Sequence, residues 1–151
     1  MLPSKISCRS LVHLAILWVV LLVHICEGQN CYQKFLRQHV DYPMTQVPEA
    51  QYYCNLMMKR RNLATSGHCK HLNTFLHADT ASIQAVCGQA GDPTTGDLRE
   101  SHASFPLTIC RLQKGSWAPD CRYQGISGLE RIIIACEEGY PVHLQTEVPG
   151  Y

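Results

Sequence analysis

Two histidines and one lysine lie in short segments whose residue types suit acid–base chemistry. His39 ends the segment FLRQH, Lys70 lies in CKHLNTF, and His143 lies in PVHL near the C-terminus. An imidazole has an ordinary pKa of about 6.5, so it can accept or donate a proton near neutral pH. A lysine is a cation that can stabilise negative charge as it develops in a transition state. Together the three side chains can supply a general base, a general acid and a positive charge without a metal ion.

Each of these residues taken alone has a simpler explanation. A single histidine is more often a surface or core residue than a catalyst, and a single lysine is usually exposed. The chain from residue 29 onward contains six histidines: His39, His68, His71, His77, His102 and His143. Only the joint occurrence of the three segments selects His39 and His143 from this set.

The first 28 residues have the layout of a secretory signal peptide. Lys5 and Arg9 precede an apolar run from Leu11 to Ile25, and Gly28 provides a small residue for cleavage. The run is short for a membrane span, which needs about 20 apolar residues. We therefore expect residues 1–28 to be removed and residues 29–151 to form one secreted domain without a membrane span.

The cysteines predict a disulfide framework. Of nine cysteines, Cys8 and Cys26 leave with the signal peptide. The rest are Cys31, Cys54, Cys69, Cys87, Cys110, Cys121 and Cys136. Spacing alone does not choose among the pairings, and one cysteine is left over. Cys31 stands close to the expected N-terminus, where a free or capped thiol and a disulfide-linked homodimer both remain open. No C-x-x-C pair indicates a metal site, so we expect no metal and no cofactor.

The net charge of the chain does not indicate a general nucleic-acid-binding protein. The chain has 13 Lys and Arg against 12 Asp and Glu, and loss of Lys5, Arg9 and Glu27 makes the two sets equal. Such binders are usually basic. The dense cluster Lys59-Arg60-Arg61 is either a binding patch or a solvated helix end.

The order of the expected elements indicates an α+β fold. Helical spacing covers residues 34–41 and 51–61, and residues 82–87 form a third short candidate. Residues 71–77 alternate as a strand, and further strands are expected at 106–112, 131–136 and 141–148, with Glu137-Glu138-Gly139 as a hairpin turn. The glycine- and aspartate-rich stretch 88–101 is expected to be an exposed loop. Helices that precede strands favour α+β.

The three segments and the cysteine order resemble the pancreatic-type ribonuclease family, and in particular its angiogenin and ribonuclease-four branch. The resemblance implies a bent antiparallel sheet with three short helices and three disulfides, Cys54–Cys110, Cys69–Cys121 and Cys87–Cys136. It also implies a secreted endoribonuclease that cleaves RNA 3′ of pyrimidines through a 2′,3′-cyclic phosphate. His39 would be the base, His143 the acid and Lys70 the electrostatic stabiliser. The implied substrate-binding residues are Lys34, Gln38, Asn73, Thr74, Glu137 and Leu144.

Two residues near the C-terminus depart from the pattern of that family. Gln145 stands where the family has an aspartate that orients the acid, and Glu147 replaces a serine close to the base pocket. Both changes predict weaker catalysis. A neutral amide stabilises the protonated form of His143 less well than an aspartate would, and an extra carboxylate repels a polyanionic substrate. An alternative function is that of an angiogenin-like signalling ligand, with weak ribonuclease activity and a receptor-binding loop at 88–101. The expected partners are RNA and, by resemblance, a ribonuclease inhibitor or a cell-surface receptor.

Overall fold

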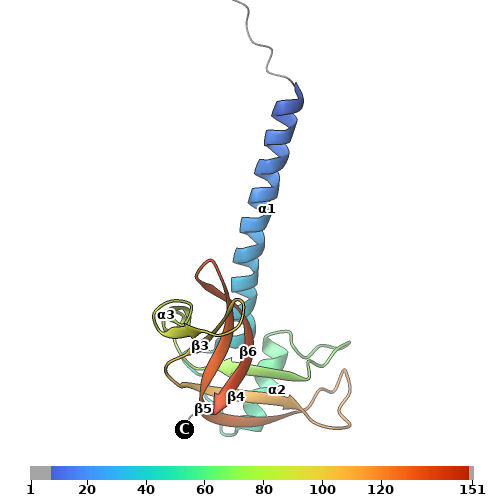
Figure 1. Cartoon of the computed structure of the whole chain (residues 1–151). Coiled ribbons are helices and arrows are strands. Elements are labelled where there is room, and N and C mark those ends of the chain that lie inside the picture. The colour runs from blue at the N-terminus through green and yellow to red at the C-terminus, as the bar shows by residue number, and fades with distance from the viewer. Residues whose placement is uncertain (1–7, 150–151) are drawn as a thin grey trace, which may run out of the picture.

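A computed structural model describes residues 8–149 of the chain (Figure 1). These residues form three helices: α1 (Cys8–His39), α2 (Ala50–Arg60) and α3 (Thr80–Ala85). The strands are β1 (Leu72–Leu76), β2 (Gly91–Pro93), β3 (Leu98–Ser101), β4 (Phe105–Leu112), β5 (Tyr123–Glu137) and β6 (Tyr140–Pro149). The α+β prediction is confirmed. The first helix is longer than expected: it was predicted at residues 34–41, and it runs from Cys8 to His39.

All six strands join one antiparallel sheet in which β5 is the central element. The order is β1-β4-β5-β3-β2, and β6 pairs with β5 as well. The first half of β5, residues 123–130, pairs with β4 and was not expected from the sequence. The second half pairs with β6, and register shifts at Ile133/Ile134 and Ala135/Cys136 interrupt that ladder. Such irregularities bend a strand and re-aim its side chains.

The tight turn between β5 and β6 matches the hairpin prediction. Glu137 pairs with Tyr140, so Glu138 and Gly139 form the two-residue loop. Their φ angles of 51° and 82° lie in the left-handed region that a type I′ turn requires.

The prediction of an exposed loop at residues 88–101 is wrong in part. This stretch folds into the hairpin β2–β3, and β3 pairs with β5 at Leu98, Arg99 and Glu100. The Arg99 guanidinium donates to the backbone carbonyl oxygens of Val86, Gly88 and Gly91, at 2.8, 2.7 and 2.5 Å. One arginine therefore satisfies backbone acceptors that a loop would leave to water. Residues 88–90, before β2, and residues 94–97, at the hairpin tip, lie outside the strands.

Two apolar clusters fill the two ends of the bent sheet. One lies beneath α2 and contains Tyr53, Met57, Met58 and Phe75. The other lies between α1, α3 and the β5–β6 pair and contains Phe35, Ile132, Ile134 and Leu144. The disulfides are Cys54–Cys110, Cys69–Cys121 and Cys87–Cys136, which are the pairs that the resemblance implied. The second cluster holds the end of α1 against the sheet.

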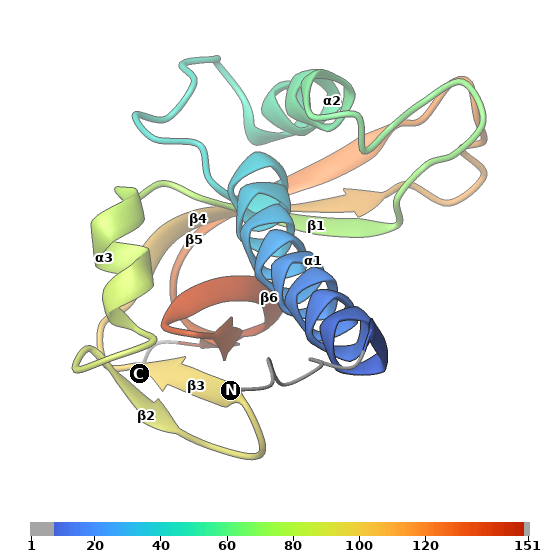
Figure 2. The same ribbon diagram turned by 90° about the horizontal axis from the view of Figure 1, so that it is seen from above.

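The N-terminal part of α1 projects away from this body (Figures 1 and 2). Its apolar side chains are more than half exposed, from Leu11 at 56% to Val19 at 59% and Trp18 at 65%. No helix among residues 8–149 is both long and apolar enough to cross a membrane.

Candidate active site

His39 is the last residue of α1, and the packing of that helix determines its position. Phe35, one turn earlier, is 1% exposed and lies in the cluster with Ile132 and Leu144. The rings of Phe35 and His39 lie 5.3 Å apart between centroids. Residues four apart share a helix face, so the side that buries Phe35 also turns His39 toward the sheet. His39 is 6% exposed.

A single hydrogen bond determines which nitrogen of His39 carries the proton. Nδ1 lies 2.9 Å from the backbone carbonyl oxygen of Thr74 on β1. A carbonyl oxygen only accepts, so Nδ1 must donate. In the neutral ring Nε2 then keeps its lone pair, which is the state that a general base requires.

The surroundings of His39 favour this neutral state. Burial lowers the pKa of His39 to about 4, and the positive charges of Lys70 and His143 act in the same direction. The hydrogen bond to Thr74 opposes them.

Lys70 is positioned by a relay that ends on α1. Its Nζ donates to Asn73 Oδ1 at 2.9 Å, and Asn73 Nδ2 donates to the carbonyl oxygen of Gln38 at 2.8 Å. Burial lowers the pKa of Lys70, and the charges of Lys34 and Arg37 lower it further. Lys34, Arg37 and Lys70 therefore form a local cluster of positive charge on a chain whose total charge is almost balanced, which is suited to a phosphate.

His143 comes from β6 and is exposed. It pairs with Ala135, between the two register shifts of the β5–β6 ladder. Leu144, its neighbour, is 9% exposed and packs in the cluster with Phe35. The alternation of a strand thus directs Leu144 inward and leaves His143 at the surface.

The remaining predicted site residues are spread over the same region. Thr74 is buried, and its hydroxyl donates to the Glu147 carboxylate on β6. Glu137 ends β5 and is exposed, as is Lys34 on α1. Cys31 is exposed and has no disulfide partner among the described cysteines. In the described part of the chain, no three His, Cys, Asp or Glu side chains are grouped in a way that could hold a metal ion.

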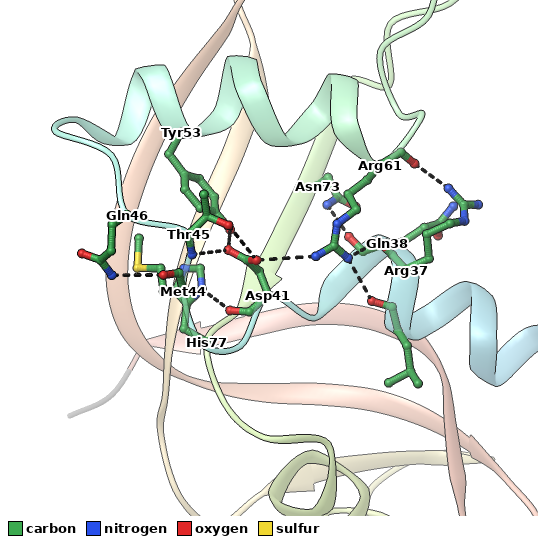
Figure 3. Close-up of polar contacts among 11 residues, drawn as sticks. Arg37, Gln38, Asp41, Met44, Thr45, Gln46, Tyr53, Arg61, Asn73 and His77 are labelled. Atoms are coloured by element: carbon green, nitrogen blue, oxygen red, sulfur yellow. Dashed lines mark hydrogen bonds and ion pairs between the residues drawn. The ribbon is translucent and has the colours of Figure 1, made fainter.

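Sequence reasoning missed a polar network that ties the end of α1 to α2 (Figure 3). Asp41, two residues after His39, accepts from the Tyr53 hydroxyl at 2.7 Å and from the Thr45 backbone at 2.9 Å. Arg61 lies 3.5 Å from Asp41 Oδ1 and donates to the Arg37 carbonyl oxygen at 2.8 Å. Arg61 therefore helps to cap α1, and of the cluster 59–61 only Lys59 and Arg60 are exposed.

His77 belongs to this network and not to the site. Its Nδ1 lies 3.1 Å from the Asp41 carbonyl oxygen, and its Nε2 lies 2.8 Å from the Thr108 hydroxyl. Both ring nitrogens of His77 have hydrogen-bond partners in the core, so we assign this histidine a structural role. The sequence gave no sign of the contacts of His77, because Asp41 and Thr108 lie 36 and 31 residues away from it.

The network leads to a stability prediction. Tyr53→Phe removes the hydroxyl that bonds the buried Asp41 carboxylate, and hydrogen bonds to charged groups contribute about 1.5–3 kcal/mol. We expect the free energy of unfolding, measured by urea denaturation, to fall by about that amount. Tyr52→Phe is the matched control, because Tyr52 is the preceding residue on α2 and is 60% exposed. Its effect should stay within about 0.5 kcal/mol, and equal effects in the two variants would contradict the role assigned to Asp41.

The sequence of the chain is similar to those of known proteins. The profile of the family described as pancreatic ribonuclease matches residues 30–145. A ribonuclease of Chelydra serpentina is 55% identical over 117 residues, 78% of this chain and 98% of the relative. An angiogenin of Saimiri sciureus is 44% identical over 125 residues, 82% of this chain and 83% of the relative.

Solved structures give the same result. The crystal structure of green turtle egg white ribonuclease superposes with a TM-score of 0.75 at 52% identity, covering 78% of this chain and 98% of that one. A zebrafish RNase5 structure gives a TM-score of 0.68 at 36% identity, covering 79% and 95%. The chain therefore belongs to the pancreatic ribonuclease family of RNA-cleaving enzymes.

Proposed function

We propose that this protein is a secreted endoribonuclease that cleaves single-stranded RNA 3′ of pyrimidines. His39 Nε2 takes the proton of the 2′-hydroxyl as its oxygen attacks the adjacent phosphorus. His143 gives its proton to the departing 5′-oxygen, and the P–O5′ bond breaks. The products are a 2′,3′-cyclic phosphate and a free 5′-hydroxyl. Lys70 stabilises the extra negative charge on the phosphorus centre between the two steps.

The observation that carries this proposal is the state of His39. Its Nδ1 donates to Thr74, so its Nε2 is available, and its lowered pKa keeps the ring neutral at physiological pH. A neutral base beside a lysine cation is the pair of states that the first step needs. His143 is exposed on β6, so the leaving group of a bound substrate can reach it. This exposure supports the proposed role of His143 as the acid.

The substrate would lie across α1 and β1. Lys34 and Gln38 lie on α1 and are proposed to contact phosphates. Thr74, beside Asn73 and Leu144, is proposed to read the pyrimidine, and Glu137 to contact the base on the far side of the cut. The positive cluster around Lys70 supports the phosphate positions.

Secretion follows from the N-terminal segment. We infer that residues 1–28 are removed, since the apolar side chains of Leu11 to Val19 are more than half exposed and the family profile begins only at residue 30. An apolar helix that the domain does not cover is suited to a signal peptide. Exposed Cys31 would then lie near the new N-terminus, where it can either remain a free or capped thiol or form a disulfide-linked homodimer.

Two dinucleotides test the proposed reaction. Secreted protein in excess EDTA should convert uridylyl-adenosine to uridine 2′,3′-cyclic phosphate and adenosine. Adenylyl-uridine, which has a purine on the 5′ side of the bond, should remain intact. Loss of activity in EDTA, or equal cleavage of both dinucleotides, would show that the proposal is wrong.

A signalling role is the second candidate, and the hairpin tip at residues 94–97 supports it. The tip is exposed, and angiogenins are among the relatives at 44% identity. A receptor-binding role predicts that Gly-Ser replacement of the tip leaves dinucleotide cleavage intact and removes only cell signalling. A ribonuclease inhibitor is a further proposed partner.

A further inference from the structure

Two tyrosines pack against each other beside the candidate active site. Tyr32 lies on α1 and Tyr140 begins β6, and their ring centroids are 4.9 Å apart with an angle of 47° between the ring planes. Tyr140 is 44% exposed, and Tyr32 is half-buried. Part of the aromatic surface of this tyrosine pair is therefore open to a partner.

Tyr32 extends the face of α1 that carries His39. The two residues are seven positions apart, which is about two helical turns and about 10 Å along the helix axis. Phe35 lies between them on the same face and is buried in the core. Exposed Lys34, which is proposed to contact a phosphate, also lies between them along the axis. Tyr32 is therefore farther from the proposed base than that phosphate contact.

Tyr140 shares a face of the sheet with His143. On the β5–β6 ladder, Tyr140 pairs with Glu137 and His143 pairs with Ala135. Glu137 and Ala135 are two residues apart on β5, and residues two apart point to the same face, as do cross-strand partners. Glu137, the direct neighbour of Tyr140, is proposed to contact the base on the far side of the cut. The tyrosine pair therefore lies on the 3′ side of the proposed cleavage site.

We propose that Tyr32 and Tyr140 form a stacking site for the second base on the 3′ side of the cleaved bond. This inference rests on the proposed function, which assigns the first base on that side to Glu137 and a phosphate to Lys34. Every base has a π face, so an aromatic side chain can stack on any of them. A phenol is uncharged near neutral pH, so the pair does not repel the neighbouring phosphates.

Three substrates separate the contribution of the second base from that of the phosphate before it. They are uridylyl-adenosine, uridylyl-adenylyl-adenosine, and the same trinucleotide with an abasic ribose at its 3′ end. For the secreted wild-type protein, kcat/KM for the full trinucleotide should exceed that for the abasic one by at least about fivefold, the lower end of what stacking of one base contributes. Comparison of the abasic trinucleotide with the dinucleotide gives the contribution of the added phosphate.

Four variants assign this ratio to the two rings. Tyr140→Ala should bring the ratio of full to abasic trinucleotide close to one, whereas Tyr140→Phe keeps the ring and should keep the ratio. Tyr32→Ala should lower the ratio, because it removes half of the stacking surface and the support of the other ring. Tyr52→Ala is the matched control, because Tyr52 is a 60% exposed tyrosine on α2, and it should leave the ratio unchanged.

The inference is overturned if the wild-type ratio is close to one. It is also overturned if Tyr140→Ala lowers kcat/KM for all three substrates equally, since the pair would then only hold α1 against β6. A loss in Tyr140→Phe as large as that in Tyr140→Ala would assign the effect to the hydroxyl and contradict stacking. A wild-type ratio in Tyr32→Ala would contradict the role of the pair.

Binding distinguishes failure of this inference from failure of the proposed function. Trinucleotides that begin with 2′-deoxyuridine lack the attacking hydroxyl, so calorimetry measures their dissociation constants without cleavage. If the wild type binds the full trinucleotide more tightly than the abasic one and Tyr140→Ala removes the difference, but no ribonucleotide substrate is cleaved, the inference stands and the cleavage mechanism fails. If the dinucleotide is cleaved as proposed but the third base changes neither rate nor binding, the inference fails and the mechanism stands. If no trinucleotide binds, both are wrong.

Discussion

His39→Ala is expected to lower kcat/KM for uridylyl-adenosine by about 10²–10⁴-fold, which is the usual contribution of one positioned acid or base. The alanine removes the Nε2 that is proposed to accept the 2′-hydroxyl proton. His143→Ala should cause a loss of the same order, because the 5′-oxygen would then leave without a proton. Initial rates with the dinucleotide measure both effects.

Another histidine provides the control for these two variants. His68 is exposed on the loop before Cys69, and its backbone carbonyl oxygen, not its ring, accepts from Thr65. His68→Ala should therefore keep the rate of the wild type. If the His39 and His143 variants retain full activity, or if His68→Ala loses as much as they do, the assignment of base and acid is wrong.

Lys70→Ala is expected to lower kcat by about 10²–10³-fold, the range found when one stabilising donor is removed from a developing negative charge. The loss should fall mainly on kcat, because the extra charge exists in the transition state and not in the bound substrate. Lys70→Arg keeps a cation but changes its shape and should recover only part of the activity.

Lys59→Ala is the control for charge alone. Lys59 is exposed on α2, so this variant removes the same charge from a surface outside the site. It should change KM for RNA slightly and leave kcat for the dinucleotide unchanged. A kcat for Lys70→Ala that equals that of Lys59→Ala would contradict the role of Lys70.

Much of the candidate site could be proposed from the sequence because its residues lie in short segments of characteristic composition. The segments around His39, Lys70 and His143 distinguish these three residues from the other histidines and lysines of the chain. The cysteine order led through resemblance to the three disulfides. The turn at Glu138-Gly139 was predictable for a local reason, since Gly139 accepts the positive φ that a hairpin of this length needs.

The missed features all depend on contacts between distant segments. Strand β3 forms from Leu98-Arg99-Glu100-Ser101, which has little β propensity, because Arg99 binds three backbone oxygens and β5 offers an open edge. The sequence around Asp41 did not indicate its partners, because Tyr53 lies on α2 and Arg61 directly follows that helix. Glu147 was expected only to repel RNA, and its bond to Thr74 joins residues 73 positions apart.

The pH dependence of kcat/KM for uridylyl-adenosine, measured in EDTA, tests the central claim most directly. A base works only when it is unprotonated, and His39 stays unprotonated down to its lowered pKa of about 4. The acid limb of the profile should therefore lie well below pH 6.5, the value for an ordinary histidine. At higher pH the rate should fall again, because the reaction also needs a protonated acid. A bell with a low acid limb, unchanged by EDTA, is the predicted result. An acid limb at about 6.5 or above, a profile with a single limb, or activity that chelation removes would contradict the account.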